Sequence, residues 1–341
     1  MVSGLKLEAQ VSSTYTFSQA SGTYTPLVAG FPSTPANIFS TSWDDDSYTG
    51  YTLPFAFFYN GTLYPAGTVI GLDTDAWFAF NPGTMTGQLG GGSWVSVSNS
   101  NGMYLYGTAN NNGFAGINAD HWYQNFTSIT GNLTSGSNVV TAVSSLTNIK
   151  IGTRLTGNSN IPDGTVVTAI GASQFTMSAN ATATSSSASI TPSASIFAMT
   201  RGTAPNRQFV VQWTGTKRFS GANNDNFSFQ MILEEAPPQQ LKVIYGPVST
   251  DVTTDLQTQV GLRGNSSADY NARTSSSTWA GTTASTANTN TVALKKTNVP
   301  ASGLTFIWTP VCPAMVAPGA VTGPSPVCPG TTQAYSIPAV T

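Results

Sequence analysis

Charge is what this sequence has least of. Asp, Glu, Lys and Arg make up 8% of its 341 residues, whereas an average globular protein has about 25%. The formal net charge is -2, so the chain lacks the basic surface that nucleic-acid binding requires, and we expect no nucleic-acid partner. Thr, Val, Ser, Gly and aromatic residues are abundant instead, which indicates an all-β protein of the extracellular type.

Long apolar runs are also missing. No segment approaches the ~18 consecutive apolar residues of a membrane-spanning helix, and no basic amphipathic helix is evident. We therefore expect no membrane insertion. The first ten residues, MVSGLKLEAQ, lack the apolar core of a signal peptide. Leu7-Glu8-Ala9 looks like the tail of a cleavage site, so we expect an export signal that was removed, lost or replaced.

Recognisable catalytic motifs are absent as well. The sequence has no Gly-x-Ser-x-Gly elbow, His-Glu-x-x-His pair, Walker loop or dinucleotide fingerprint. His121 is the single histidine, and without a nucleophile motif nearby a structural role is favoured over a catalytic one. Glu234 and Glu235 are neighbours on one expected strand, so their side chains would point to opposite faces. We expect a protein that is not an enzyme and that has no cofactor.

Cysteine is scarce. Cys312 and Cys328 are the two in the chain, and each lies in a Pro-Val-Cys-Pro segment. A disulfide between them would close a loop and add about 3 kcal/mol of stability in the chain-entropy model. The alternative is that each pairs with a cysteine in a region outside this chain. The Cys-x-x-Cys spacing of redox and metal sites is absent.

The stretch Gly202–Val248 carries the clearest secondary-structure pattern. Phe209–Trp213, Phe227–Leu233 and Leu241–Tyr245 are apolar runs separated by turn-forming residues, which predicts consecutive antiparallel strands. Apolar residues alternate from Phe227 to Leu233, as in a strand that lies over a core. Asn60-Gly61 between two apolar runs predicts a hairpin. These patterns predict an antiparallel β-sandwich, jelly-roll-like.

The composition divides the chain into parts. Residues 130–193 are rich in Ser, Thr, Ala and Val and poor in aromatics, which predicts a small β domain inserted into a loop of the main sandwich. The sandwich itself would comprise residues 1–129 and 194–310. Residues 311–341 would be a Pro/Gly linker followed by an extended strand, TTQAYSI, that has nothing to pair with inside the chain.

Adjacent carboxylates stand out in so uncharged a sequence. Asp44, Asp45 and Asp46 follow Trp43. Ca²⁺ prefers several oxygen ligands, so one interpretation is a calcium site. The ligand spacing of an EF-hand is absent, and a solvated turn is the other interpretation.

Aromatic residues gather in the first part of the chain. Tyr104, Tyr106, Trp122 and Tyr123 could stack on sugar rings if they are exposed. The alternative is that they fill the sandwich core, as aromatic side chains more often do.

Several segments carry a resemblance to known proteins. Those of the main domain are VSSTYTFSQASGTYT, GTAPNRQFVVQW, NFSFQMILEE, LKVIYG, VGLRGNSSADYNART and SGLTFIWTP. Together they resemble the N-terminal β-sandwich region of modular cell-surface proteins of Bacteroidota-type bacteria, which the type 9 secretion system commonly exports. The insert, with TSGSNVVT, IGTRLTG and IPDGTVVTAI, resembles modules of phage tail-fibre and adhesin-like proteins. Residues 321–341 resemble the start of a PKD-like repeat. The resemblance implies an extracellular or cell-surface location.

These observations favour a structural or adhesive surface protein. The unpartnered strand at the C-terminus, with Thr331, Gln333, Tyr335 and Ile337 on one side, would pair with the sheet edge of a neighbouring subunit and build a homopolymer. Val11–Phe17 could serve the same purpose. The alternative function is a carbohydrate-binding module of a secreted modular enzyme, with a glycan or another surface ligand as partner. A hydrolase is the least favoured interpretation.

Overall fold

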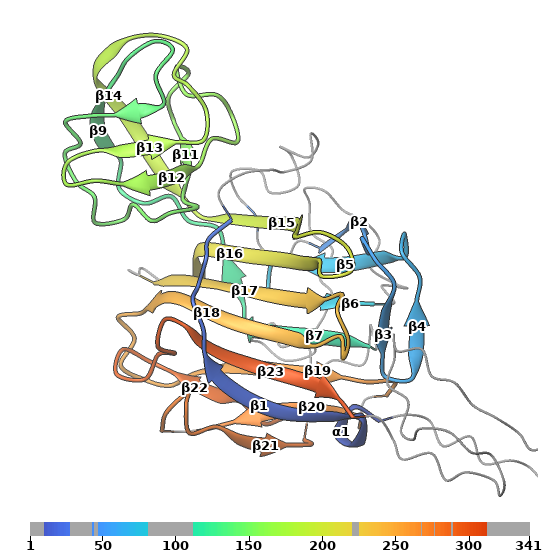
Figure 1. Cartoon of the computed structure of the whole chain (residues 1–341). Helices are drawn as coiled ribbons and strands as arrows, with labels where there is room; N and C mark the ends of the chain where they lie inside the picture. The colour runs from blue at the N-terminus through green and yellow to red at the C-terminus, as the bar shows by residue number, and fades with distance from the viewer. Residues whose placement is uncertain are drawn as a thin grey trace, which may run out of the picture.

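The chain folds into two facing antiparallel β-sheets with a small β-rich insert at one end (Figure 1). The computed structural model describes residues 10–27, 43, 47–80, 112–219, 225–266, 268–275, 277–287 and 289–311. Over these residues the predicted all-β, antiparallel sandwich is confirmed. Helix α1 (Val11–Thr14) has four residues, and no helix in the described ranges is long and apolar enough to cross a membrane.

The first sheet contains the strands expected from the alternating apolar runs. Its strand order is β1-β23-β18-β17-β16-β15, and β8 pairs with β16. The bounds are β1 (Tyr15–Ser21), β23 (Leu304–Pro310), β18 (Leu241–Ser249), β17 (Asn226–Glu234), β16 (Gln208–Arg218), β15 (Ser195–Arg201) and β8 (His121–Trp122). The three predicted runs of Gly202–Val248 lie in β16, β17 and β18, next to one another in that order. That prediction is therefore confirmed.

The second sheet lies against the apolar face of the first. Its order is β2-β5-β6-β7-β19-β20-β21, and β22 pairs with β19. The bounds are β2 (Ser47–Thr52), β5 (Val69–Asp73), β6 (Trp77–Ala79), β7 (Gly113–Asn118), β19 (Leu256–Arg263), β20 (Tyr270–Thr274), β21 (Thr283–Ser285) and β22 (Val292–Leu294). A separate hairpin joins β3 (Phe57–Tyr59) to β4 (Thr62–Tyr64). Its turn is Asn60-Gly61, as predicted, with both residues at positive φ.

Aromatic side chains hold the two sheets together. Trp213 of the first sheet stacks on Phe229 at 5.1 Å between ring centroids. Its indole Nε1 donates to the carbonyl oxygen of Thr74, beyond the end of β5, at 3.0 Å. Phe114 and Trp308 meet edge to face across the interface at 5.6 Å. Because such rings each remove a large apolar area from water, this cluster is the main source of stability.

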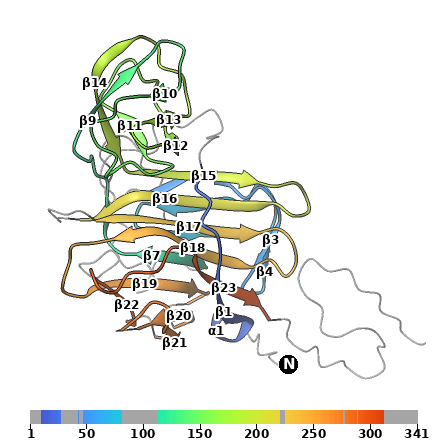
Figure 2. The ribbon, with the colours of Figure 1, turned by 60° about the vertical axis from the view of Figure 1, so that its left-hand side comes forward.

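The insert forms a separate β-rich lobe beyond β15 (Figure 2). It has an apolar core of its own. Its strands form two three-stranded sheets, β10-β13-β12 and β11-β14-β9. They are β9 (Ile129–Leu133), β10 (Val139–Val140), β11 (Arg154–Thr156), β12 (Val167–Ile170), β13 (Phe175–Met177) and β14 (Ser185–Ser193). Hydrogen bonds tie the insert to the sandwich: Phe126 N donates to Pro192 O, and Ser195 Oγ donates to Gly152 O, both at 2.9 Å.

The segment that follows β1 crosses the outer face of the first sheet. Figure 1 shows it running from β1 at one edge to β15 at the other. On its way the Thr25 carbonyl oxygen accepts from Gln230 Nε2, and Leu27 N donates to Gln212 Oε1, both at 2.7 Å. This crossing explains why Gln212 and Gln230, which point away from the core, are fully buried.

The start of the chain differs from the sequence expectation. Val11–Phe17 was predicted as one strand, but Val11–Thr14 forms α1 and the strand begins at Tyr15. The backbone N–H groups of Ser13 and Thr14 both donate to the Gln10 carbonyl oxygen. Val11 N donates to the buried carboxylate of Asp269 at 2.8 Å, so a tertiary contact replaces the strand pairing at these residues.

Candidate functional site

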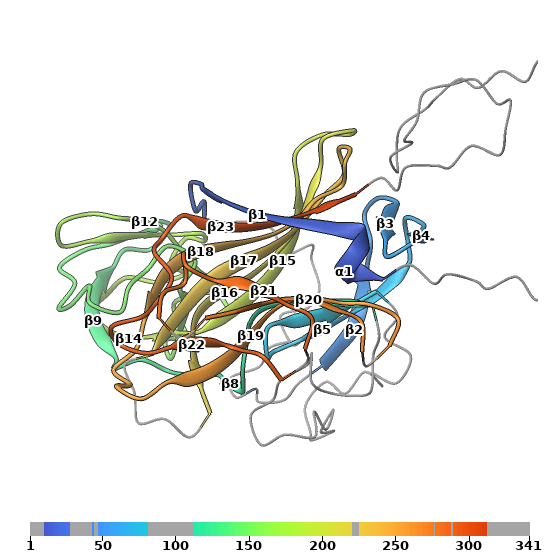
Figure 3. The same cartoon turned by 90° about the horizontal axis from the view of Figure 1, so that it is seen from below.

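The outer edge of β1 is the first candidate site. β1 is the terminal strand of its sheet and pairs with β23 in an uninterrupted antiparallel register from Tyr15↔Pro310 to Ser21↔Leu304. Figure 3, seen from below, shows β1 along the near margin of the sheet.

The register decides which backbone groups of β1 remain available. Val311 N donates to Thr14 O at one end, and Gly22 N donates to Gly303 O at the other, both at 2.7 Å. In an antiparallel ladder, alternate residues face the partner strand. The even-numbered residues therefore bond to β23. The N–H and C=O groups of Phe17, Gln19 and Ser21 point away from it, and no described residue pairs with them.

One end of this edge is closed. Asn271 Nδ2 donates to the carbonyl oxygens of Val11 and Tyr15, at 3.0 and 2.9 Å. Asp269 holds the start of α1 through Val11 N. Burial raises the pKa of the Asp269 carboxyl above its ordinary value, although hydrogen bonds from backbone N–H groups act against this. The available edge therefore begins at Phe17.

Side chains along the edge are sorted by face. Phe17 packs inward against Phe306 and Trp308, at 5.2 and 5.3 Å between ring centroids. The Arg273 guanidinium lies 3.7 Å from the Phe17 ring centroid, and burial lowers the pKa of Arg273 to about 10. Gln19 Nε2 donates to Ala280 O at 2.8 Å. On the opposite face the side chains are small and exposed; they are Thr16, Ser18 and Ala20.

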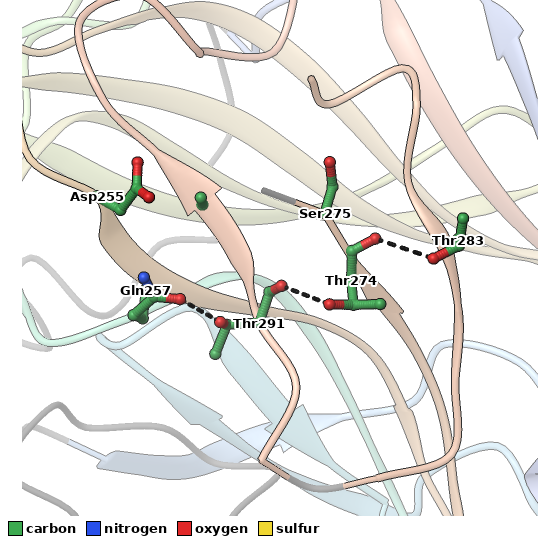
Figure 4. A pocket seen from close by; sticks show the side chains of 7 residues that line it. Asp255, Gln257, Thr274, Ser275, Thr283 and Thr291 are labelled. Atoms are coloured by element: carbon green, nitrogen blue, oxygen red, sulfur yellow. Dashed lines mark hydrogen bonds between the residues drawn. The ribbon is translucent and has the colours of Figure 1, made fainter. Parts of the chain in front are cut away.

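A polar pocket in the second sheet is another candidate (Figure 4). It opens to solvent and has a volume of about 340 Å³. This volume is near the lower limit for small-ligand sites. Residues from β19, β20, β21 and β22 and from the positions next to these strands line it; they are Asp255, Gln257, Thr274, Ser275, Thr283, Thr291 and Ala293.

The hydroxyl groups that line this pocket offer a ligand mainly hydrogen-bond acceptors. Thr274 Oγ1 donates to Thr291 O at 3.0 Å, and Thr291 Oγ1 donates to Gln257 Oε1. Ser275 Oγ donates to a neighbouring carbonyl oxygen. With their hydrogens engaged, these oxygens have lone pairs left. Asp255 adds a carboxylate that pairs with Lys295 at 2.9 Å. The pocket therefore suits a small ligand that donates hydrogen bonds, such as a sugar.

The predicted sugar-stacking aromatics lie in different environments. Trp122 is half-buried and packs against Phe219, which is 45% exposed, at 5.0 Å between ring centroids. The Lys217 ammonium lies 4.8 Å from the Trp122 ring centroid. Tyr123 is buried instead, and its hydroxyl donates to Asn125 Oδ1 at 2.6 Å. Tyr104 and Tyr106 lie outside the described residues.

His121 and the two glutamates have structural contacts. His121 is fully buried, with Nε2 2.6 Å from Ile117 O and Nδ1 2.9 Å from Thr216 Oγ1. Glu234 pairs with Lys242 at 2.7 Å. Glu235 accepts hydrogen bonds from the Arg207 guanidinium, which hold the pKa of Glu235 below its ordinary value. Each glutamate thus has a different cationic partner, and Glu235 lies just beyond the end of β17 at Glu234.

Other predicted site residues lie outside the described ranges. They are the calcium candidates Asp44, Asp45 and Asp46, the cysteines Cys312 and Cys328, and the assembly strand Thr331, Gln333, Tyr335 and Ile337. These assignments stay predictions. Among the residues that the structure describes, no three His, Cys, Asp or Glu side chains gather as a metal site would require.

Fold and surface together define an antiparallel β-sandwich domain whose candidate sites are a strand edge and a polar pocket. A family model described as NIDO related matches residues 96–310, the insert included. Because this match covers more than half of the 341 residues, the chain belongs to the NIDO-related family of extracellular, β-rich domains. No curated protein and no solved structure matches the chain.

Proposed function

We propose that this chain is a non-enzymatic, extracellular structural or adhesive surface protein whose subunits assemble into a homopolymer by β-strand addition through their termini. Its family and its fold agree with an extracellular role. The resemblance to exported Bacteroidota-type surface proteins and to a PKD-like repeat fits the same location. The observation that carries the proposal is the available edge of β1, because an edge strand offers a template on which another chain can pair.

The chemistry of β1 supports this role. Natural sheets usually protect an edge with charged residues, with proline or with a bulge. β1 has the sequence YTFSQAS, without a charge or a proline, and its register with β23 shows no bulge. β23 also ends beside this edge, because its last residue, Pro310, pairs with Tyr15. A C-terminal strand would thus start its path next to an acceptor edge.

Polymer formation tests the proposal directly. We expect the full-length chain to form filaments in electron micrographs and large species in sedimentation, both increasing with concentration. Removal of residues 321–341 should leave a folded monomer with an unchanged circular dichroism spectrum. Filaments that persist after this removal would contradict assembly through the C-terminal strand. Residues 1–17 are unsuitable for a deletion test, because β1 is already part of the first sheet.

Carbohydrate binding is the second candidate function. It is favoured by the acceptor-lined pocket around Thr291 and by the exposed Phe219 beside Trp122. A glycan array with the purified chain distinguishes the two sites. Binding that Thr291→Val abolishes would assign the pocket, whereas binding that Trp122→Ala abolishes would assign the aromatic pair. A folded chain that binds no glycan would reject this candidate and leave the assembly role untouched.

A further inference from the structure

We propose that the acceptor site for assembly is the outer edge of β1 at Phe17, Gln19 and Ser21, and that its occupant is the segment Thr331–Ile337 of a second copy. This inference rests on the proposed function and names the partner surface of that function. It assigns to β1 the role of acceptor, whereas the sequence pattern alone suggested Val11–Phe17 as a donor strand.

Backbone geometry supports the acceptor role. Phe17, Gln19 and Ser21 each direct an N–H and a C=O away from β23, as the register between Thr14–Val311 and Gly22–Gly303 requires. An incoming strand could exchange a pair of hydrogen bonds with each of them. The side chains of β1 itself do not point in this direction, since those of Phe17 and Gln19 turn toward the second sheet and those of even-numbered residues lie on the outer face.

Side-chain size is matched between the edge and the proposed occupant. Thr331–Ile337 reads TTQAYSI, so a strand would place small residues on one face and larger ones on the other. The small set, Thr332, Ala334 and Ser336, corresponds to the small exposed residues Thr16, Ser18 and Ala20. The larger set then lies on the side of Phe17, where Tyr335 and Ile337 can extend the aromatic surface. Proline at 338 ends the segment, because it has no N–H for a ladder.

The path of the chain favours a second copy over the same one. Between Pro310 and Thr331 the sequence is PVCPAMVAPGAVTGPSPVCPG. Proline-rich linkers favour extended backbone of about 3.1 Å per residue, which would carry the strand well past the length of β1. With Cys312 and Cys328 not joined to each other, a linker of this length lets the C-terminal segment of one subunit reach the β1 edge of the next. Repetition of this heterologous contact would build a chain of subunits.

A matched pair of substitutions at one position tests the acceptor. Gln19→Pro removes the outward N–H, and proline is tolerated where that N–H does not serve the native ladder. Gln19→Ala keeps the N–H and removes the same side-chain bond to Ala280 O. We expect wild type and Gln19→Ala to polymerise, and Gln19→Pro to remain a monomer with an unchanged circular dichroism spectrum. Polymers formed by a folded Gln19→Pro chain would overturn the inference.

A second experiment, with a peptide, tests this inference separately from the proposed function. A fluorescent peptide of residues 329–339 is titrated into the full chain carrying Tyr335→Pro, which disables the donor, with and without Gln19→Pro. We expect saturable binding that Gln19→Pro weakens at least tenfold. Peptide binding without polymers in the wild type would retain the edge site and reject the polymer. Polymers in the wild type without peptide binding would retain the polymer and reject this site.

Discussion

The single histidine offers a sensitive test of the sandwich core. His121 is fully buried between β7, which carries Ile117, and β16, which carries Thr216. A carbonyl oxygen only accepts hydrogen bonds, so Nε2 carries the hydrogen and donates to Ile117 O, while Nδ1 accepts from the Thr216 hydroxyl. The ring also packs against Phe227 at 5.5 Å between centroids. This site suits a neutral imidazole.

The sign and size of the pH effect follow from the pKa. Burial lowers the pKa of His121 from 6.5 to about 4. The unfolded chain therefore binds more protons, and stability is lost as the pH falls below the unfolded pKa. Linkage predicts a loss of about 2 kcal/mol between pH 7 and pH 5. Asp163 and Glu235 have lowered pKa values and titrate below this range, whereas Asp269, whose pKa is raised, acts in the opposite direction.

Urea unfolding at both pH values, with a His121→Gln variant as control, isolates the histidine. At pH 7 the free energy of unfolding of the variant should be lower by about 1–3 kcal/mol, because buried hydrogen bonds are lost. Most of the change in this free energy between pH 7 and pH 5 should disappear. Asp269 is present in both proteins. Subtracting the pH dependence of the variant's unfolding free energy from that of the wild type therefore also removes the contribution of Asp269. The reasoning would be refuted if the variant kept the pH dependence of the wild-type unfolding free energy. An NMR titration that gave His121 a pKa near 6.5 would also refute it.

Two further predictions concern the insert and the second sheet. Phe175→Ala, in the core of the insert, should destabilise it by about 3–5 kcal/mol, seen as faster hydrogen exchange in β9 to β14, whereas Ile170→Ala at a 42% exposed site should change little. Gly261→Ala should strongly lower the melting temperature, because φ is +147° and a Cβ would lie 2.5 Å from the Ala272 Cα. Gly67→Ala, at positive φ in open space, should cost only about 1 kcal/mol; equal melting temperatures for the two glycine variants would contradict this.

Sequence patterns of a few neighbouring residues predicted the strands and turns that such short patterns determine. The strands around Phe209, Phe227 and Leu241 followed from alternation, and the hairpin at Asn60-Gly61 followed from its turn residues. Contacts between distant residues explain the failures. α1 forms where strand was expected because Asp269, 258 residues further on, binds Val11 N. The burial of Gln212 likewise depends on Leu27, 185 residues before it.

The candidate sites were less predictable than the fold. Pairing of β1 with β23 joins nearly the first and the last described residues, and only this register shows which N–H groups of Phe17–Ser21 face outward. The polar pocket was missed because its residues are spread from Asp255 to Ala293 and are mostly threonine and serine, which are common throughout the sequence. Trp122, by contrast, was a candidate from its residue type alone, and its contact with Phe219 came from the structure.

Cryo-electron microscopy of the assembled full-length chain tests the central claim most directly. The account predicts filaments in which an additional strand, with the sequence of Thr331–Ile337, lies beside Phe17–Ser21 of the neighbouring subunit. Filaments in which this edge of β1 remains bare and subunits meet through other surfaces would contradict it.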